Sequence, residues 1–402
     1  IQNLQPGLLH SAWAGPAVQG RLKAEATGAD TIALSADLQA PKAQATNAAG
    51  PAALQWEQLQ LTGQWHPERW DIDSLRLQAA RAVLEAQFKW QPAQDAVQGR
   101  MTLQLPGMQA QQPHMLWSLS KSVVGLLAGQ LLHEGVLDGE ALVSDYLPEL
   151  AESGWKGATV QQVLNMTAAV DYRETFDGPQ SDLFKYAVAA GILPAPHGFQ
   201  GAASLYEYLP TIGEQGRHGV EFHYRTAHTE VLGWLMRRAT GQSSAELIAE
   251  RLWSKLGAEQ DAYLMVDAAG AEWAGAGLNV SPRDLARLAE LLRLDGAFNG
   301  QQIIAPEVLA TIRAGGDREA FKAGGRTWQP GYSYRNQFWI SHNRDGAYEA
   351  LGAHGQMIHI NPAVGLVMVR LSSHPQASSG ATFNTTRPAL EALADWARKR
   401  KS

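Results

Sequence analysis

The sequence predicts an α+β protein that consists of a β-rich N-terminal region and a larger domain of helices and antiparallel strands. Two observations support this prediction. Glutamine is concentrated at the start of the chain, with 18 Gln up to residue 112 and 14 in the remaining 290 residues. Near the same point, the spacing of apolar residues changes from the alternation typical of strands to helical spacing. We therefore divide the chain into regions 1–108 and 109–402.

In the N-terminal region, apolar and polar residues alternate over short segments. Residues 84–90 place Leu84, Phe88 and Trp90 on one face, and residues 101–105 repeat the pattern. Glycine and proline residues separate these segments, as expected for turns. The pattern indicates short antiparallel or stacked strands with one buried face.

Beyond residue 111 the apolar residues recur at helical spacing. The first helix opens at Ser118, is apolar from Val123 to Leu132, and ends before Gly135. Because the helices are grouped apart from a few strands, the region reads as α+β. Further helices are expected at residues 229–241, 246–256, 282–294 and 387–399, and strands at residues 334–340, 355–360 and 366–371.

The composition excludes several classes of function. The chain has no cysteine, so disulfides, thiolate zinc sites and a cysteine nucleophile are ruled out. Its net charge is −6 and its one basic run is residues 398–401, which argues against a nucleic-acid partner. No segment reaches the roughly 18 to 20 apolar residues of a membrane span. Because the sequence begins at Ile1, an upstream leader or anchor is left open.

The sequence Ser-x-x-Lys occurs twice, at Ser118 to Lys121 and at Ser153 to Lys156. Residues three apart on a helix lie on the same face, so a serine hydroxyl and a lysine amine at this spacing come within reach of each other. The first copy opens a helix, whereas glycines around the second copy indicate a surface loop. The alternative for Ser118 is an ordinary helix cap, and for Lys121 a solvated charge in the first turn.

Two further features could complete a site around Ser118. Tyr224 lies just before a predicted helix, in a loop position from which its phenol could point into a cleft. The alternative is a tyrosine packed at a helix entrance with its hydroxyl hydrogen-bonded. Residues 352–356, Gly-Ala-His-Gly-Gln, place small residues at the start of a strand, which predicts that the backbone there approaches another group closely. A β-bulge is the alternative there.

From about residue 111 to the C-terminus, the sequence resembles the serine β-lactamase-like hydrolases, and among them the 6-aminohexanoate-dimer hydrolases and related esterases. This resemblance implies a β-lactamase/transpeptidase-like fold, an antiparallel sheet with a helical subdomain. It also implies hydrolysis of small esters or short amides with no metal or cofactor. The stretches that carry it are residues 117–122 (Trp-Ser-Leu-Ser-Lys-Ser), 165–167 (Asn-Met-Thr), Tyr224 with 231–234, 281–286, and 352–356 with Asn361-Pro362.

The resemblance also implies a role for individual residues. Ser118 is the acylated nucleophile, Lys121 its general base and Tyr224 the proton shuttle to the leaving group. The backbone N–H groups of Ser118 and Ala353 form the oxyanion hole. Further candidates for substrate binding, each with core packing as the alternative, are His354, Gly355, Gln356, Tyr172, Phe176 and Trp339.

The sequence departs from this family at two places. Relatives that cleave amides carry a tyrosine on the mobile loop after the Met-Thr motif, where this chain has Phe176, with Tyr172 nearby. Phenylalanine cannot donate a hydrogen bond to a departing amine, so ester cleavage is favoured. The strands that normally precede the nucleophile helix are not recognisable. The chain is then a natural fusion, a mis-joined gene, or a hydrolase whose missing strands are supplied by residues 81–105.

The N-terminal region resembles repeats of the large inner-membrane subunit of the bacterial translocation and assembly module, on residues 59–65 and 99–107. Such proteins form β-grooves and are not enzymes; a generic β-rich accessory domain is the alternative. The competing function is therefore a non-enzymatic envelope or lipid-handling module with a degenerate hydrolase domain. A penicillin-interacting enzyme is disfavoured, because the third motif lacks Lys-Thr-Gly. We expect a periplasmic location, with the cytoplasm as the alternative; the oligomeric state is left open.

Overall fold

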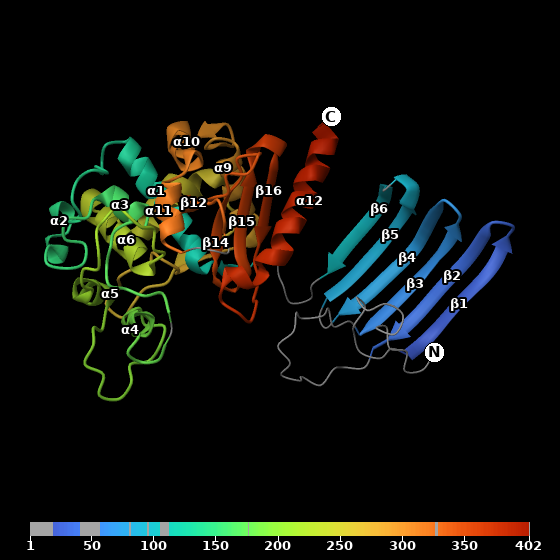
Figure 1. The fold of residues 1–402 in the computed structure, drawn as a ribbon, viewed down its shortest axis with the longest axis horizontal. Coiled ribbons are helices and arrows are strands. Elements are labelled where there is room, and N and C mark those ends of the chain that lie inside the picture. Colours follow the sequence, from blue (N-terminus) through green and yellow to red (C-terminus); the bar gives the residue numbers. More distant parts are fainter. Residues whose placement is uncertain are drawn as a thin grey trace. The chain divides into compact units, whose positions relative to one another are not determined.

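The computed structural model divides into two compact units, residues 1–109 and 110–402, which are shown in Figure 1. In its described residues the first unit is made of strands and one short 3-10 turn, and the second combines helices with small antiparallel sheets. The structure describes residues 19–40, 57–79, 82–94, 96–104, 112–175, 177–325 and 329–401.

The first unit is an antiparallel sheet in which each strand pairs with its neighbours in sequence, in the order β1-β2-β3-β4-β5-β6 (Figure 1). Leu59 pairs with Leu77 and Leu77 with Leu84, so apolar residues line one face of the sheet. The predicted strand-rich N-terminal region is confirmed. The strands are β1 Gln19–Gly28, β2 Thr31–Gln39, β3 Gln58–His66, β4 Arg69–Ala79, β5 Ala82–Gln91 and β6 Ala96–Gln104.

The main sheet of the second unit is antiparallel, with the order β12-β13-β14-β15-β16. One face carries Tyr348 and Ile358, which are part of the main hydrophobic core. The other carries Leu351 and Met357, which pack with Leu390 of the C-terminal helix. The strands are β12 Ser333–Arg335, β13 Phe338–Ile340, β14 Tyr348–Gly352, β15 Gln356–Asn361 and β16 Leu366–Arg370.

The helices α1 to α11 lie on one side of this sheet and are called the helical group below, whereas α12 lies along its other side (Figure 1). The predicted helix at residues 246–256 is α7 and α8 joined by a π-helical turn, Ala249–Trp253. The helices are α1 Ser120–His133, α2 Val143–Tyr146, α3 Val160–Leu164, α4 Asp182–Ala189, α5 Leu205–Tyr208, α6 Thr226–Thr240, α7 Ser244–Ile248, α8 Ser254–Leu256, α9 Pro282–Arg293, α10 Pro306–Ala314, α11 Arg318–Ala323 and α12 Phe383–Lys401. Two small sheets complete the unit: β7 His114–Met115, β9 Leu278–Val280 and β8 Tyr263–Leu264, and the hairpin β10 Ala297–Phe298 with β11 Gln301–Gln302. Within the described residues, no helix is long and apolar enough to cross a membrane.

The prediction of one continuous strand at residues 334–340 is wrong, because the chain reverses direction there. Asn336 and Gln337 have φ angles of 46° and 66°, so they form a two-residue turn between β12 and β13. The turn packs against α1: a Cβ on Gly125 would lie 2.4 Å from the Asn336 carbonyl oxygen. Ser122 Oγ also donates a hydrogen bond of 2.6 Å to the Gln337 carbonyl. This contact fixes the first turns of α1 against the sheet.

A buried histidine joins α6 to the loops beside it. Trp155 Nε1 donates to His228 Nδ1 at 3.1 Å, and His228 Nε2 lies 3.0 Å from the Ala168 carbonyl oxygen. The imidazole is fully buried. Burial, assisted by the nearby charge of Arg225, lowers the pKa of His228 to about 3. The folded protein therefore keeps this ring neutral at any pH near neutrality.

This histidine predicts a loss of stability in mild acid. Below its ordinary pKa of about 6.5, the unfolded His228 binds a proton that the folded side chain does not bind. The free energy of unfolding should fall by about 1.4 kcal/mol per pH unit from this group as the pH decreases from 6.5 toward 3. The measurement is the free energy of unfolding in urea at pH 7 and at pH 5. The difference between the two values should be smaller in His228→Gln than in the wild type. His197→Gln, at an exposed position, is the control; equal pH dependence in all three proteins would contradict the assignment.

Candidate active site

Ser118 lies in a short 3-10 turn, Trp117–Leu119, that leads directly into α1. The preceding Trp117 has a φ of 50°, which is uncommon for a bulky non-glycine residue and marks a strained backbone. Two aromatic neighbours hold it: its ring centroid lies 6.2 Å from that of Trp273 and 5.2 Å from that of His354. The structure therefore places Ser118 at the opening of the buried helix, as the sequence predicted.

The three residues predicted to be catalytic, Ser118, Lys121 and Tyr224, come together at the N-terminus of α1. Lys121 Nζ donates hydrogen bonds of 3.0 Å to Ser118 Oγ and 2.7 Å to the Gly275 carbonyl oxygen. The same Nζ lies 5.3 Å from the centroid of the Tyr224 ring. Ser118 and Tyr224 are distant in sequence, so only the fold brings the hydroxyl, the amine and the phenol together.

The environment of Lys121 favours its neutral form. The side chain is 1% exposed, and burial lowers the pKa of Lys121 from 10.5 to about 8. The carboxylates of Glu174 and Glu230 act in the opposite direction and keep that pKa from falling further. The lowered pKa makes this amine better able to accept a proton from a hydroxyl at hydrogen-bond distance.

Tyr224 is supported by the aromatic residues of the β12–β13 hairpin. Its ring stacks on Trp339, with centroids 5.5 Å apart and planes at 24°. Tyr334 meets the same ring edge-on at 6.3 Å. Trp339 is 4% exposed. The structure thus places Trp339 beneath the ring of Tyr224. Trp339 belongs to the same buried apolar cluster as Leu351 and Met357.

The segment 352–356 lies beside the nucleophile, and the predicted close approach of its backbone to another group is confirmed. A Cβ on Gly352 would lie 2.2 Å from the carbonyl oxygen of Leu116, two residues before Ser118. The segment does not open a strand: Gly352 ends β14, a 3-10 turn follows, and Gln356 begins β15. This packing brings the turn that contains Ala353 against the start of α1.

Side chains of the turn itself fix its shape. Gln356 Nε2 donates to the carbonyl oxygens of Ala353 at 3.0 Å and Ser372 at 2.6 Å, and Gln356 Oε1 accepts from Ser372 N at 2.8 Å. His354 has a φ of 59°, and its Nδ1 lies 2.8 Å from the His374 carbonyl oxygen. Gln356 is 1% exposed, so in this structure its amide holds the backbone around Ala353.

The other predicted substrate-binding residues are placed differently. Tyr172 is 1% exposed and packs edge-on against Tyr186, with centroids 6.4 Å apart. In the described part of the chain its buried hydroxyl has no hydrogen-bond partner. Burial raises the pKa of Tyr172 well above its ordinary value. Phe176 lies outside the described residues.

The second Ser-x-x-Lys copy does not form a similar pair. Ser153 Oγ donates to the Leu150 carbonyl at 2.8 Å, whereas Lys156 Nζ contacts Glu152 at 2.9 Å. Lys156 is exposed, as predicted for a surface loop, but Ser153 is only 6% exposed and the surface prediction is wrong for it. The apolar residues at helical spacing after Ser118 were the signal that distinguished the first Ser-x-x-Lys copy from the second.

Sequence reasoning missed two carboxylates near Lys121. Glu174 accepts hydrogen bonds from Thr226 N at 2.8 Å and from Thr226 Oγ1, which ties its loop to the start of α6. Glu230 lies inside α6 and is 2% exposed. An acidic residue within the apolar run of α6 was the available signal for Glu230. Among the described residues, no group of three or more side chains could hold a metal ion.

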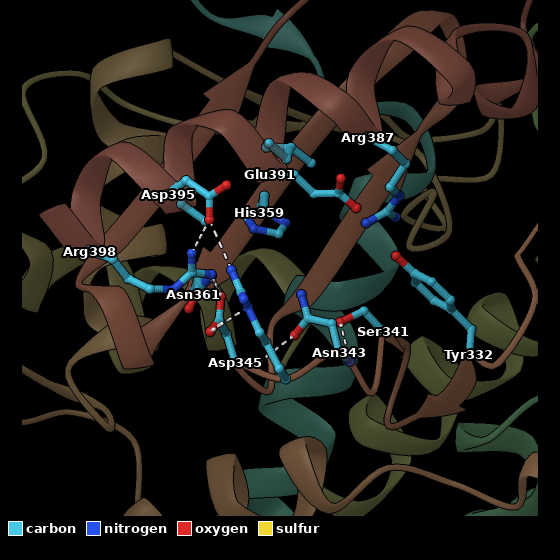
Figure 2. A pocket seen from close by; sticks show the side chains of 13 residues that line it. Tyr332, Ser341, Asn343, Asp345, His359, Asn361, Arg387, Glu391, Asp395 and Arg398 are labelled. Atoms are coloured by element: carbon cyan, nitrogen blue, oxygen red, sulfur yellow. Dashed lines mark hydrogen bonds and ion pairs between the residues drawn. The ribbon is translucent and has the colours of Figure 1, made fainter. Parts of the chain in front are cut away.

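A polar cavity of about 510 Å³ lies along α12 and is lined mainly by charged and polar side chains (Figure 2). Its charged groups largely pair with one another: Arg387 and His359 both bond the buried Glu349, and Arg398 bonds Asp345 at 2.8 Å. None of the predicted catalytic residues is among the described residues that line it. The cluster around Ser118 is therefore the candidate active site.

Comparison with known proteins shows the family of this chain. The model of the family described as Beta-lactamase matches residues 81–393. The chain belongs to the β-lactamase family. The match covers the helical group and the five-stranded sheet, and it begins one residue before β5. In the structure β5 and β6 pair within that six-stranded sheet.

Individual relatives of this β-lactamase-family chain are consistent with that assignment. It is 37% identical over 263 residues to the 6-aminohexanoate-dimer hydrolase of Paenarthrobacter ureafaciens; the match covers 65% of this chain and 66%, just under two thirds, of the relative. A Bacillus anthracis structure named as a 6-aminohexanoate-dimer hydrolase is 31% identical with a TM-score of 0.67, over 75% of this chain and 78% of the other. A family VIII carboxylesterase, 18% identical with a TM-score of 0.51 over 67% and 79% of the chains, shares the fold. The predicted β-lactamase/transpeptidase-like fold is confirmed, and the protein is a serine hydrolase.

The contact between Gly352 and Leu116 predicts a strict requirement for glycine. In Gly352→Ala the new Cβ must displace the Leu116 carbonyl, and with it the turn that holds Ser118. Because small displacements of reacting groups are costly, hydrolysis of p-nitrophenyl acetate should fall at least about tenfold. Gly213→Ala is the control, since a Cβ there would meet no atom within 4 Å. Full activity of Gly352→Ala would show that this contact does not position the site.

Proposed function

We propose that this protein hydrolyses small carboxylic esters and short amides through an acyl-enzyme on Ser118. The observation that carries the proposal is the 3.0 Å contact between Ser118 Oγ and the buried amine of Lys121. A hydroxyl is a weak nucleophile until a base takes its proton, and a lysine is such a base only when its pKa is lowered. Burial meets that condition for Lys121.

The proposed reaction has two halves. Neutral Lys121 accepts the Ser118 proton while Oγ bonds to the substrate carbonyl carbon, and the carbonyl electron pair moves to the oxygen. The N–H groups of Ser118 and Ala353 stabilise that oxyanion. The intermediate collapses and the bond to the leaving group breaks. Tyr224 passes its phenolic proton to that group and regains a proton from the protonated Lys121, which leaves the amine neutral again. Water then attacks the acyl-serine in the same way and restores Ser118, with no metal or cofactor in either half.

Between ester and amide substrates, the proposal favours esters. An amide nitrogen leaves only when it gains a proton or a strong hydrogen bond, whereas a phenoxide leaves readily. Phe176 on the loop after Met166-Thr167 cannot donate that hydrogen bond, and the hydroxyl of Tyr172 is buried. We expect no turnover of β-lactams, because the third motif is His354-Gly355-Gln356 and lacks the Lys-Thr-Gly of penicillin binders.

A second candidate function is a non-enzymatic envelope or lipid-handling module. The observation in its favour is the first unit, where apolar residues line one face of a six-stranded sheet. Leu22 and Trp90 on that sheet are 56% and 40% exposed. This alternative extends the resemblance of residues 1–108 to translocation and assembly module repeats, and with it we propose a periplasmic location. It predicts bound lipid and no turnover.

The proposed function predicts that Ser118→Ala abolishes esterase activity. Hydrolysis of p-nitrophenyl acetate and butyrate should fall at least about a thousandfold, because no other group replaces the nucleophile. Ser153→Ala is the matched control, since Ser153 belongs to the second Ser-x-x-Lys copy and bonds a backbone carbonyl. Its activity should equal that of the wild type. All three proteins are first checked for cooperative unfolding.

Two results of this assay would contradict the proposal. Turnover retained in Ser118→Ala would remove Ser118 from the mechanism. A folded wild-type protein with no turnover, together with lipid in the purified protein, would favour the non-enzymatic module.

The leaving-group argument predicts that Phe176→Tyr improves amide cleavage. The new phenol can donate a hydrogen bond to a departing amine, so kcat/KM for a short acyl p-nitroanilide should rise about tenfold or more. The value for the matching p-nitrophenyl ester should change little. Phe176→Leu, which also alters the ring but adds no donor, is the control. An equal change for both substrates would show that this position does not assist the leaving group.

A further inference from the structure

Glu230 is a buried carboxylate in the middle of α6, six residues after Tyr224. Its exposed fraction is 2%. Its oxygens accept hydrogen bonds from Tyr186 Oη at 2.6 Å and from the backbone N–H groups of Ala274 and Gly275 at 2.9 Å each. Burying a carboxylate is unfavourable unless such partners replace water. The cost of burying this acid suggests that it does more than fill the core.

The partners of Glu230 lead directly to the proposed base. The N–H of Gly275 donates to Glu230, and the carbonyl of Gly275 accepts from Lys121 Nζ at 2.7 Å. One residue of backbone therefore connects the carboxylate to the catalytic amine. A Cβ on Gly275 would lie 2.6 Å from Glu230 Oε1 and 2.8 Å from Thr226 Cγ2, so the backbone is pressed against α6.

A second side chain secures Glu230 from the other direction. Tyr186 of α4, which donates to the carboxylate, itself accepts a hydrogen bond from Trp273 Nε1. Trp273 also packs against Trp117, the strained residue before Ser118. Tyr186 thus connects Glu230, through the ring of Trp273, to the residue that precedes Ser118.

The charge of Glu230 acts on Lys121 as well. The negative carboxylate raises the pKa of Lys121 against the effect of burial, while burial raises the pKa of Glu230 to about 7. The two groups are thus coupled, and each favours the charged form of the other. The titratable groups that face this pair from the surrounding elements are Glu174, Tyr172, Tyr186, Tyr206 and Tyr224.

We infer that Glu230 is a positioning residue for the catalytic amine: it holds the Ala274–Gly275 backbone that binds Lys121 Nζ, and it supplies a negative charge close to that amine. The inference rests on the proposed role of Lys121 as the base. It assigns Glu230 no contact with the substrate. A purely structural Glu230 would affect stability and leave the titration of the base unchanged.

The test is the pH dependence of kcat/KM for p-nitrophenyl acetate in Glu230→Gln. Glutamine keeps the size of the side chain but removes the charge, so the base loses protons more readily. The acid limb of the profile, near pH 8 in the wild type, should move to lower pH by about one unit. The maximal kcat/KM should also fall at least about tenfold, because the Gly275 carbonyl is no longer held in place. Glu230→Asp restores the charge and should return the acid limb toward its wild-type position.

Tyr186→Phe provides an independent variant if Glu230→Gln folds poorly. Without the phenol, Glu230 ionises less readily, so the acid limb should move in the same direction by a smaller amount. Glu349→Gln is the matched control: it removes a fully buried carboxylate that bonds His359 and Arg387 instead. It should change the unfolding midpoint and leave the acid limb in place.

The outcomes separate this inference from the proposed function. An acid limb that stays at its wild-type pH in both Glu230→Gln and Tyr186→Phe overturns the role of Glu230, whatever the change in rate. Activity that survives Ser118→Ala overturns the proposed function instead. A shifted limb in both variants, with Glu349→Gln unshifted, supports the inference.

Discussion

The burial of one lysine amine is the constraint on which the rest of the site depends. Lys121 is 1% exposed and bonds Ser118 Oγ and the Gly275 carbonyl. Water would hold that amine protonated near neutral pH, whereas burial lowers its pKa to about 8 and makes it a usable base. Two nearby carboxylates keep it from becoming too weak a base. The fold must therefore exclude water from the amine and still present a serine hydroxyl to it.

Several close backbone contacts serve that requirement. Gly352 lets the end of β14 approach the chain just before the nucleophile, and Gly125 lets α1 approach the β12–β13 turn. Trp117 keeps a strained φ of 50° because the rings of Trp273 and His354 pack against its side chain. The ring of Tyr224 stacks on Trp339 of the β12–β13 hairpin. The helical group and the sheet thus each supply part of the site, and a shift of the sheet would move the turn that contains Ala353 away from Ser118.

The sequence predicted the parts of this arrangement that depend on local spacing. A serine and a lysine three residues apart at the start of an apolar helix predict their contact directly, and alternation predicts the strands of the first unit. The β12–β13 hairpin was missed because aromatic residues lie on both sides of the polar stretch 335–337 and no glycine or proline marks a turn there, so the segment looked like one continuous strand. Glu230 was missed because its partners, Tyr186 and Gly275, are more than 40 residues away along the chain. Such contacts follow from the tertiary fold and leave no local pattern.

The account's central claim is that Ser118 is a nucleophile activated by Lys121. Its most direct test is covalent labelling with a fluorophosphonate, read by mass spectrometry of the digested protein. The account predicts one adduct, on the peptide that contains Ser118, with a labelling rate that rises as the pH increases through about 8. It also predicts no adduct in Ser118→Ala. A folded wild-type protein that stays unlabelled, or one labelled at another residue, would contradict the account.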